Sequence, residues 1–141
     1  MLRSGLTGRT ITRGEIYWTQ DDVIMLPTQR LPNEPERTMH EGRPVVVLQT
    51  DLDNSNPAYR IVLVAPISHR VQFKDDKDVK LTAGQGGLPQ DSLVHLGLIQ
   101  PILKIELGRL IGKLDPITMS DMDAVAAANL GLSERPSAPS I

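Results

Sequence analysis

The sequence predicts a mainly β (α+β) domain, in which a small, strongly bent antiparallel sheet or barrel is followed by one C-terminal helix. Short apolar, β-branched runs recur along the chain and are separated by turns that contain glycine or proline. Only residues 119–130 show the apolar i, i+3, i+4 spacing of a helix that packs on a sheet. The length of 141 residues corresponds to one domain.

Two apolar runs, residues 45–48 and 61–65, predict the central pair of strands. The segment 51–57 between them is rich in Asp and Asn and ends in proline, which is typical of a turn. Antiparallel pairing brings the start of the first strand beside the end of the second. We therefore expect Arg43 and Ser68 to lie at the same edge of the sheet.

The remaining elements are predicted from alternation and from breaker residues. In chain order they are a strand at 15–18, a long loop at 20–42, a half-exposed hairpin formed by 71–74 and 78–81, a strand at 92–99 that ends or bends at Pro101, a helical turn at 103–107 and a strand at 109–114. The loop is interrupted by prolines, and its part from residue 27 onward is expected to be a mobile flap or an inert insertion.

The predicted helix runs from Met119 to Leu130, with Thr118 as its N-cap and Gly131 as its left-handed C-terminal residue. Outside the domain, which we place at residues 13–132, the tails 1–12 and 133–141 are polar and non-periodic. Both tails are expected to be disordered.

The composition excludes several classes of function. The chain has no cysteine, so thiol catalysis and thiolate metal sites are absent, and no spacing typical of metal ligands or a bound cofactor is present. The net charge of −2 provides no global attraction for nucleic acid. No run approaches the roughly 18 apolar residues of a membrane span. We expect a cytoplasmic protein that binds no membrane and needs neither metal nor cofactor.

Ordered short motifs resemble those of the MazF/PemK (Kid) toxins over residues 13–132. The motifs are Arg-Gly-Glu-Ile-Tyr-Trp at 13–18, Gly-Arg-Pro-Val-Val-Val at 42–47, Ala-Pro-Ile-Ser at 65–68, Asp-Ser-Leu at 91–93, Arg109-Leu110 and Gly131-Leu132. The resemblance implies an SH3-like β-barrel of about seven short strands with a C-terminal α-helix, present as a homodimer. It also implies an endoribonuclease that cleaves single-stranded RNA without metal and is neutralised by a cognate antitoxin protein.

The motif residues of that family fall on Arg43 and Ser68. RNA carries its own nucleophile, the 2′-OH, so the protein has only to align it, stabilise charge on the phosphate and assist proton transfer. The resemblance implies that the planar fork of Arg43 clamps the phosphate. It also implies that Ser68 donates a hydrogen bond to the developing oxyanion.

Each of the three histidines is a candidate for proton transfer near neutral pH. His40, three residues before Arg43, is the first choice. The segment His-Glu-Gly-Arg at 40–43 resembles the acidic, sometimes histidine-containing loop that precedes this arginine in the family. His69 follows Ser68 directly, so strand alternation points the two side chains to opposite faces unless the strand bends. His95 is expected to be a partly buried histidine with satisfied hydrogen bonds.

Five residues are expected to bind the substrate around Arg43 and Ser68: Glu41, His69, Arg70, Gln100 and Lys104. The resemblance places a basic residue two positions after a glutamine. Here Lys104 is the first cation after Gln100. The part of the site formed by the segment around Gln100 is therefore expected to differ from that of relatives.

Two other functions remain open at this point. The CcdB type of toxin shares the barrel and acts on DNA gyrase by protein contact, without cutting RNA. A degenerate member of the family would bind RNA and leave it intact. Cleavage of RNA in the presence of a chelator separates both alternatives from the nuclease.

Overall fold

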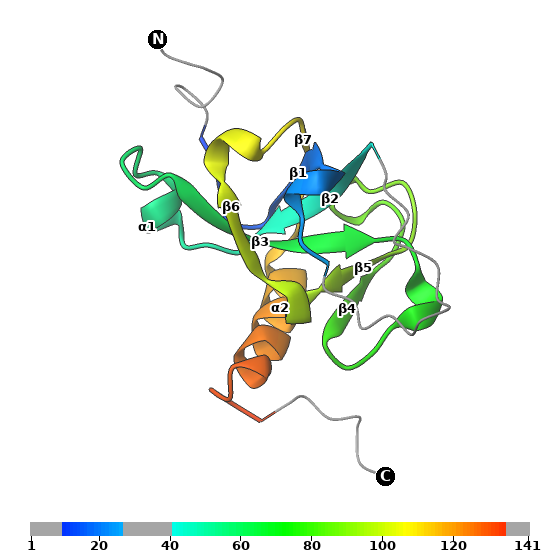
Figure 1. The fold of residues 1–141 in the computed structure, drawn as a ribbon. Helices are drawn as coiled ribbons and strands as arrows, with labels where there is room; N and C mark the ends of the chain where they lie inside the picture. The colour runs from blue at the N-terminus through cyan, green and yellow to red at the C-terminus, as the bar shows by residue number, and fades with distance from the viewer. Residues whose placement is uncertain (1–9, 27–40, 135–141) are drawn as a thin grey trace, which may run out of the picture.

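The computed structural model describes residues 10–26 and 41–134. This part of the chain forms a curled antiparallel sheet and one long helix (Figure 1). The strands are β1 (Glu15–Gln20), β2 (Gly42–Val47), β3 (Ile61–Ser68), β4 (Asp78–Leu81), β5 (Ser92–His95), β6 (Gln100–Leu103) and β7 (Leu110–Lys113). The helices are α1 (Asp51–Asn54) and α2 (Pro116–Asn129), with 3-10 turns η1 (Asp21–Val23), η2 (Val71–Phe73), η3 (Gln85–Gly87), η4 (Leu96–Leu98) and η5 (Lys104–Glu106).

The seven strands are neighbours in the order β4-β5-β3-β2-β1-β7, and β6 pairs separately with β3. β3 therefore has two partners on one side. Ile61 to Val64 pair with β6, whereas Ile67 and Ser68 pair with β5. All of these pairings are antiparallel. The switch of partner along one strand bends the sheet and produces the predicted mainly β fold with a C-terminal helix.

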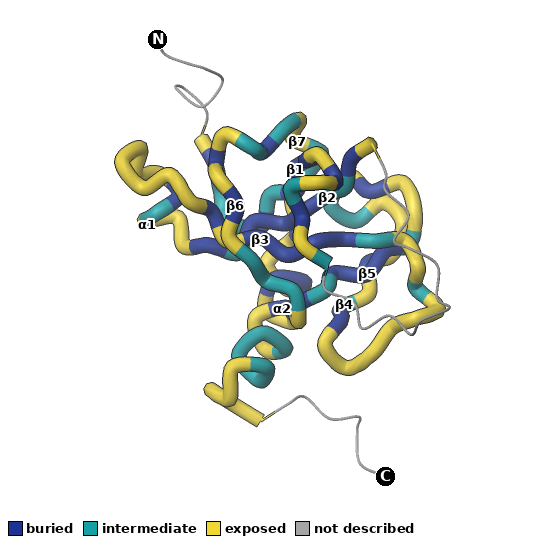
Figure 2. The backbone as a smooth tube through the Cα atoms, in the orientation of Figure 1, coloured by how far each residue is buried: buried dark blue, intermediate teal, exposed yellow. Residues whose placement is uncertain are grey.

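Two hydrophobic cores lie on the two faces of the sheet, and β2 contributes to both. Val46 belongs to the core that includes Met119 and Met122 of α2. Val45 and Val47 belong to the other core, and all three valines are fully buried. In Figure 2 the central strand β3, which pairs with β2, is drawn mostly in the dark blue of buried residues. A strand buried on both faces has no polar side to show, which explains the unbroken apolar run.

Helix α2 begins three residues before the predicted start. Asp115 is the N-cap, and its carboxylate accepts a hydrogen bond from the backbone N–H of Thr118 at 2.7 Å, while Pro116 occupies the first turn. Thr118 therefore lies inside the helix. Met122 is completely buried, but Leu130 is exposed, so the apolar stripe covers less of the helix than predicted.

The predicted hairpin at 71–81 is wrong. Residues 71–73 form the 3-10 turn η2, and β4 pairs with β5 instead, with Asp78 opposite His95 and Val79 opposite Val94. Residues 71–74 do alternate between apolar and polar. β4 pairs with β5 instead, where Leu93 and Val94 are fully buried.

The predicted strand at 92–99 is a strand only as far as His95, and a second strand begins beyond the predicted range. β5 ends at His95, the 3-10 turn η4 follows, and β6 begins at Gln100 with Pro101 inside it, opposite Leu63. The turn lets the chain pair first with the end of β3 and then with its start. The helical turn expected at 103–107 is present as η5.

The described part of the chain begins at residue 10, within the predicted N-terminal tail, and Ile11 there is 2% exposed and packs in the second core. The predicted flap at 27–42 falls mostly outside the described residues, as do residues 1–9 and 135–141 of the predicted tails.

Gly112 of β7 is a position where the fold tolerates no side chain. A Cβ there would lie 2.2 Å from the carbonyl oxygen of Gly86, which is backbone and cannot rotate away. Gly112→Ala should lower the free energy of unfolding by about 1–3 kcal/mol, as overpacking does elsewhere. Urea denaturation followed through Trp18, the single tryptophan, measures this loss.

Gly97→Ala is the matched control, because its Cβ would meet only the flexible side chain of Lys77, at 3.3 Å. It should cost much less than Gly112→Ala. Equal losses at the two positions would contradict the packing of η3 on β7.

Candidate functional site

Four polar side chains lie on one face of four neighbouring strands. Asp78 and His95 are directly opposite in the pairing of β4 with β5. Ser68 of β3 is opposite Leu93, two residues from His95 and so on the same face. Continuing the register of β2 and β3 by two residues places Arg43 opposite Ser68. We call Asp78, His95, Ser68 and Arg43 the polar row.

Arg43 is held at one end of the polar row by two contacts. Its Nε donates to Asp21 Oδ1 at 2.9 Å, and its Nη1 donates to the carbonyl oxygen of Ile67 at 3.3 Å. The arginine side chain is 11% exposed and Asp21 is 1% exposed. Within residues 10–26 and 41–134, Nη2 makes no hydrogen bond. The guanidinium is therefore fixed beside Ser68 with one nitrogen available to an anion.

Ser68, His95 and Asp78 form a continuous chain of hydrogen bonds. Ser68 Oγ lies 2.8 Å from His95 Nε2, and His95 Nδ1 lies 2.9 Å from Asp78 Oδ1. The other carboxylate oxygen of Asp78 accepts from the backbone N–H of Asp75 at 3.0 Å. The side chain of Asp78 is 7% exposed and that of His95 23%. The imidazole is therefore oriented from both sides and still partly open to solvent.

The structure brings the two motif residues together as predicted but brings a different histidine to them. His40 lies outside the described residues. His69 is exposed and, within the described chain, its side chain makes no hydrogen bond. His95, expected to be an ordinary partly buried histidine, is the one in contact with Ser68.

Lys104 is not brought to the polar row. It is 3% exposed, and its Nζ donates to the carbonyl oxygens of Asp53, Asn54 and Asn56 at 2.7, 3.2 and 3.0 Å. Its backbone N–H bonds to Arg60, eight residues before Ser68 along the chain, or roughly 25 Å of extended strand. Burial lowers the pKa of Lys104. Lys104 ties α1 to η5.

Gln100 is likewise occupied by the backbone. Its Oε1 accepts from the N–H of Met25 at 2.8 Å, and its Nε2 donates to the carbonyl oxygens of Met25 and Leu98, both at 3.0 Å. Gln100 therefore holds the end of the first described segment against β6. Glu41 and Arg70 are exposed; Glu41 directly precedes β2, and Arg70 follows the end of β3 by two residues.

No sequence pattern selects Asp78 or Asp21. Asp78 was assigned to a hairpin with 71–74, and only the pairing of β4 with β5 places it opposite His95. Asp21 lies in η1, directly after β1, and reaches Arg43 because β1 pairs with β2. An aspartate at a strand end is too common to signal such a contact.

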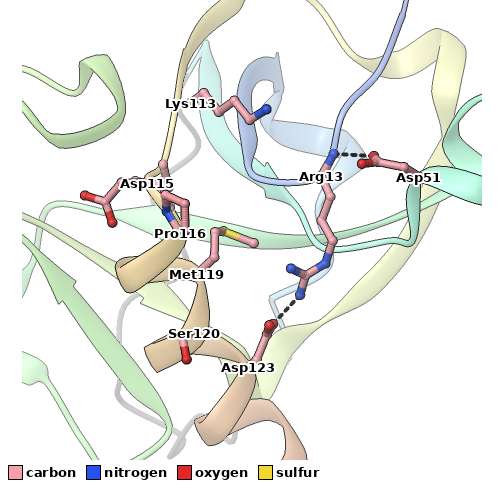
Figure 3. A pocket seen from close by; sticks show the side chains of 9 residues that line it. Arg13, Asp51, Lys113, Asp115, Pro116, Met119, Ser120 and Asp123 are labelled. Atoms are coloured by element: carbon pink, nitrogen blue, oxygen red, sulfur yellow. Dashed lines mark hydrogen bonds and ion pairs between the residues drawn. The ribbon is translucent and has the colours of Figure 1, made fainter.

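A separate hollow lies near the start of α2 and is lined by charged residues (Figure 3). Three of its charged residues already contact one another. Arg13 contacts Asp123, and its backbone N–H donates to Asp51 Oδ1 at 2.7 Å. The hollow adjoins the core on the α2 side of the sheet, whereas the polar row is on the opposite face. We therefore place the candidate site at the polar row.

Within the described residues, no three His, Asp or Glu side chains are placed to hold a metal ion. None of the helices there is long and apolar enough to cross a membrane.

A curled seven-stranded sheet with a C-terminal helix is the fold of the toxin family that the sequence resembles. The match to a family model covers residues 12–130, and the chain belongs to the PemK-like, MazF-like toxins of type II toxin–antitoxin systems. No curated protein sequence matches the chain.

Several solved structures are similar to this fold. The Mycobacterium tuberculosis toxin MazF-mt6 is 25% identical, covers 84% of this chain and 98% of its own, and has a TM-score of 0.63. An endoribonuclease in complex with its cognate antitoxin from a mycobacterial species is 18% identical, with coverages of 88% and 96% and a TM-score of 0.61. A MazE–MazF structure from Deinococcus radiodurans is 13% identical, with coverages of 89% and 99% and a TM-score of 0.64.

Lys104→Met tests the structural assignment of this lysine. The change leaves three carbonyl oxygens without their donor, so the free energy of unfolding should fall by roughly 1–3 kcal/mol. Lys80→Met is the control, because Lys80 is half exposed and lies 3.7 Å from Asp91, an ion pair of little value. Chemical denaturation measures both, and equal stabilities would contradict the assignment.

Asp51 should contribute to the pH dependence of stability. The backbone N–H of Arg13, and then the amide of Asn54, lower the pKa of Asp51 below 3.8. The stabilisation is complete above the unfolded value and is lost as the pH falls through the lower folded value. The difference in unfolding free energy between the parent and Asp51→Asn should therefore shrink below about pH 4. A difference that stays constant from pH 6 to pH 2 would contradict this prediction.

Proposed function

We propose that this protein is a toxin endoribonuclease that cleaves single-stranded RNA by transesterification through the substrate's own 2′-OH. The observation that carries the proposal is the placement of Arg43 beside Ser68, with the guanidinium fixed by Asp21 and by the Ile67 carbonyl. A cation already held in position stabilises developing charge without having to reorganise. Membership of the toxin family and the mycobacterial endoribonuclease of the same fold support the same activity.

The chemistry asks little of the protein. The 2′-oxygen attacks the adjacent phosphorus in line with the departing 5′-oxygen, giving a 2′,3′-cyclic phosphate and a 5′-OH. The remaining donor nitrogen of Arg43, Nη2, would donate to a non-bridging oxygen, where negative charge increases. Because the nucleophile belongs to the substrate, no metal ion is needed to generate one. Glu41, His69 and Arg70 are proposed to contact flanking nucleotides, and His40 is retained as a candidate in proton transfer.

We also propose that a cognate antitoxin binds over the polar row and that the active form is a homodimer in the cytoplasm. Two structures of this fold contain an antitoxin or MazE with the toxin. With 15 basic and 17 acidic side chains, the chain as a whole has no strong positive field. Because the whole chain provides no attraction, an extended acidic segment would be attracted by the local cations Arg43 and Arg70 instead.

Arg43→Ala should reduce the cleavage rate by at least about 10²-fold, the scale for losing one preorganised donor to an oxyanion. The assay incubates mixed RNA with the protein in chelator and maps the cut ends, where 5′-OH and cyclic phosphate termini are expected. Arg43→Lys is the matched variant because it keeps the charge opposite Asp21 but loses the planar fork.

Undiminished cutting by folded Arg43→Ala, or loss of cutting in chelator, would contradict the mechanism. RNA that is bound and left intact by the parent protein would favour the RNA-binding alternative, and absence of both binding and cleavage would favour a toxin that acts by protein contact.

A further inference from the structure

The connectivity of Ser68, His95 and Asp78 restricts which atom carries each proton. Asp78 Oδ1 lies 2.9 Å from His95 Nδ1, and an ionised carboxylate can only accept a hydrogen bond. Nδ1 of the neutral imidazole must therefore carry the hydrogen. Nε2 is then an acceptor, and the Ser68 hydroxyl, 2.8 Å away, donates to it.

This restriction changes the role of Ser68. With its hydrogen directed to His95, the hydroxyl presents lone pairs to a ligand and cannot at the same time donate to a phosphate oxygen. A lone pair beside Arg43 suits a group that has a proton to give. In RNA bound with its phosphate on Arg43, the 2′-OH is such a group.

From this geometry we infer that Ser68, His95 and Asp78 form a proton relay that removes the 2′-OH proton of RNA. The relay rests on the proposed nuclease activity and assigns its general base. His95 acts through Ser68, and Asp78 is a positioning residue that holds the tautomer. The arrangement parallels Ser-His-Asp triads, in which the carboxylate orients the imidazole and does not itself take the proton. The nucleophile here is the 2′-oxygen of the substrate.

The 2′-oxygen bonds to phosphorus as its proton passes to Ser68 Oγ and the serine proton passes to His95 Nε2. The bond from phosphorus to the 5′-oxygen breaks, and the leaving oxygen keeps the electron pair and takes a proton from water. The imidazolium then gives its proton to the resulting hydroxide, which restores neutral His95.

The other charged groups near the relay are paired with other residues or are exposed beyond the strand end. On β4 and the turn before it, Lys80 lies 3.7 Å from Asp91 and Lys77 lies 3.2 Å from Asp76. Across β3, Arg43 pairs with Asp21, and His69 and Arg70 are exposed beyond the strand end. Helix α2 packs on the opposite face. In the described part of the chain, Asp78 is the one charged group in hydrogen-bond contact with His95.

The tautomer is tested first, without RNA. Nitrogen NMR of the imidazoles, with the three histidines assigned by single substitutions, should show neutral His95 protonated on Nδ1. In Asp78→Asn, the amide can keep its oxygen toward the Asp75 N–H and turn its NH₂ toward Nδ1, so the proton should move to Nε2. A parent protein with the proton on Nε2 would overturn the relay.

Cleavage of RNA across pH tests the function of the relay. The parent rate should fall at low pH, because protonated Nε2 can no longer accept a proton. His95→Gln keeps an acceptor for Ser68 but cannot titrate, so it should lose at least about 10²-fold in rate and also lose this pH dependence. Asp78→Asn should lose on the order of 10²–10⁴-fold through the wrong tautomer.

Asp76→Asn is the control, because it changes an exposed carboxylate in the same turn that does not contact the imidazole. It should leave both the rate and the pH profile unchanged. If His95→Gln and Asp78→Asn cut RNA with the parent profile, the relay is wrong while the nuclease assignment stands. If the parent protein cuts no RNA, the nuclease assignment fails, and with it the relay's function, whatever tautomer the NMR shows.

Discussion

The structure depends on β3, which divides its pairing between two strands. Its first half pairs with β6 and its last two residues pair with β5, while β2 covers its other edge from Val64 to Pro66. The backbone groups of a buried strand must all find partners, so this division obliges the chain to turn a corner at η4. The same division places the end of β3 between β2 and β5. Ser68 is thereby flanked by Arg43 on one side and His95 on the other.

The polar row is rigid because its charged ends are held by the fold. Asp21 fixes the guanidinium of Arg43 and is almost completely buried, and Asp78 is held by the backbone of Asp75. A buried ion pair contributes little net stability, but removing one partner is costly. Such pairs therefore serve mainly to fix geometry. In this molecule they set the direction of two groups that would act on a phosphate and on the proton beside it.

Other charged residues stabilise the fold far from this row. Lys104 donates hydrogen bonds to three carbonyl oxygens at the end of α1. Arg13 connects α1 with α2 through Asp51 and Asp123. A buried lysine with three carbonyl partners is satisfied as an ammonium group, and it closes a helix end that would otherwise leave acceptors unpaired. Lys104 and Arg13 therefore stabilise the fold and are not available to a ligand of the polar row.

The sequence by itself determined the fold class, the antiparallel pairing of β2 with β3, and the meeting of Arg43 with Ser68, because continuous apolar runs and their bounding turns are local features. It did not determine the partner of β4 or the break between β5 and β6. Period-two alternation shows that a residue is in a strand but not which strand lies beside it. For that reason Asp78 and His95, 17 residues apart, met only in the tertiary structure. The same limit made Lys104 resemble a substrate ligand, since a lysine in a sequence does not show whether carbonyls surround it.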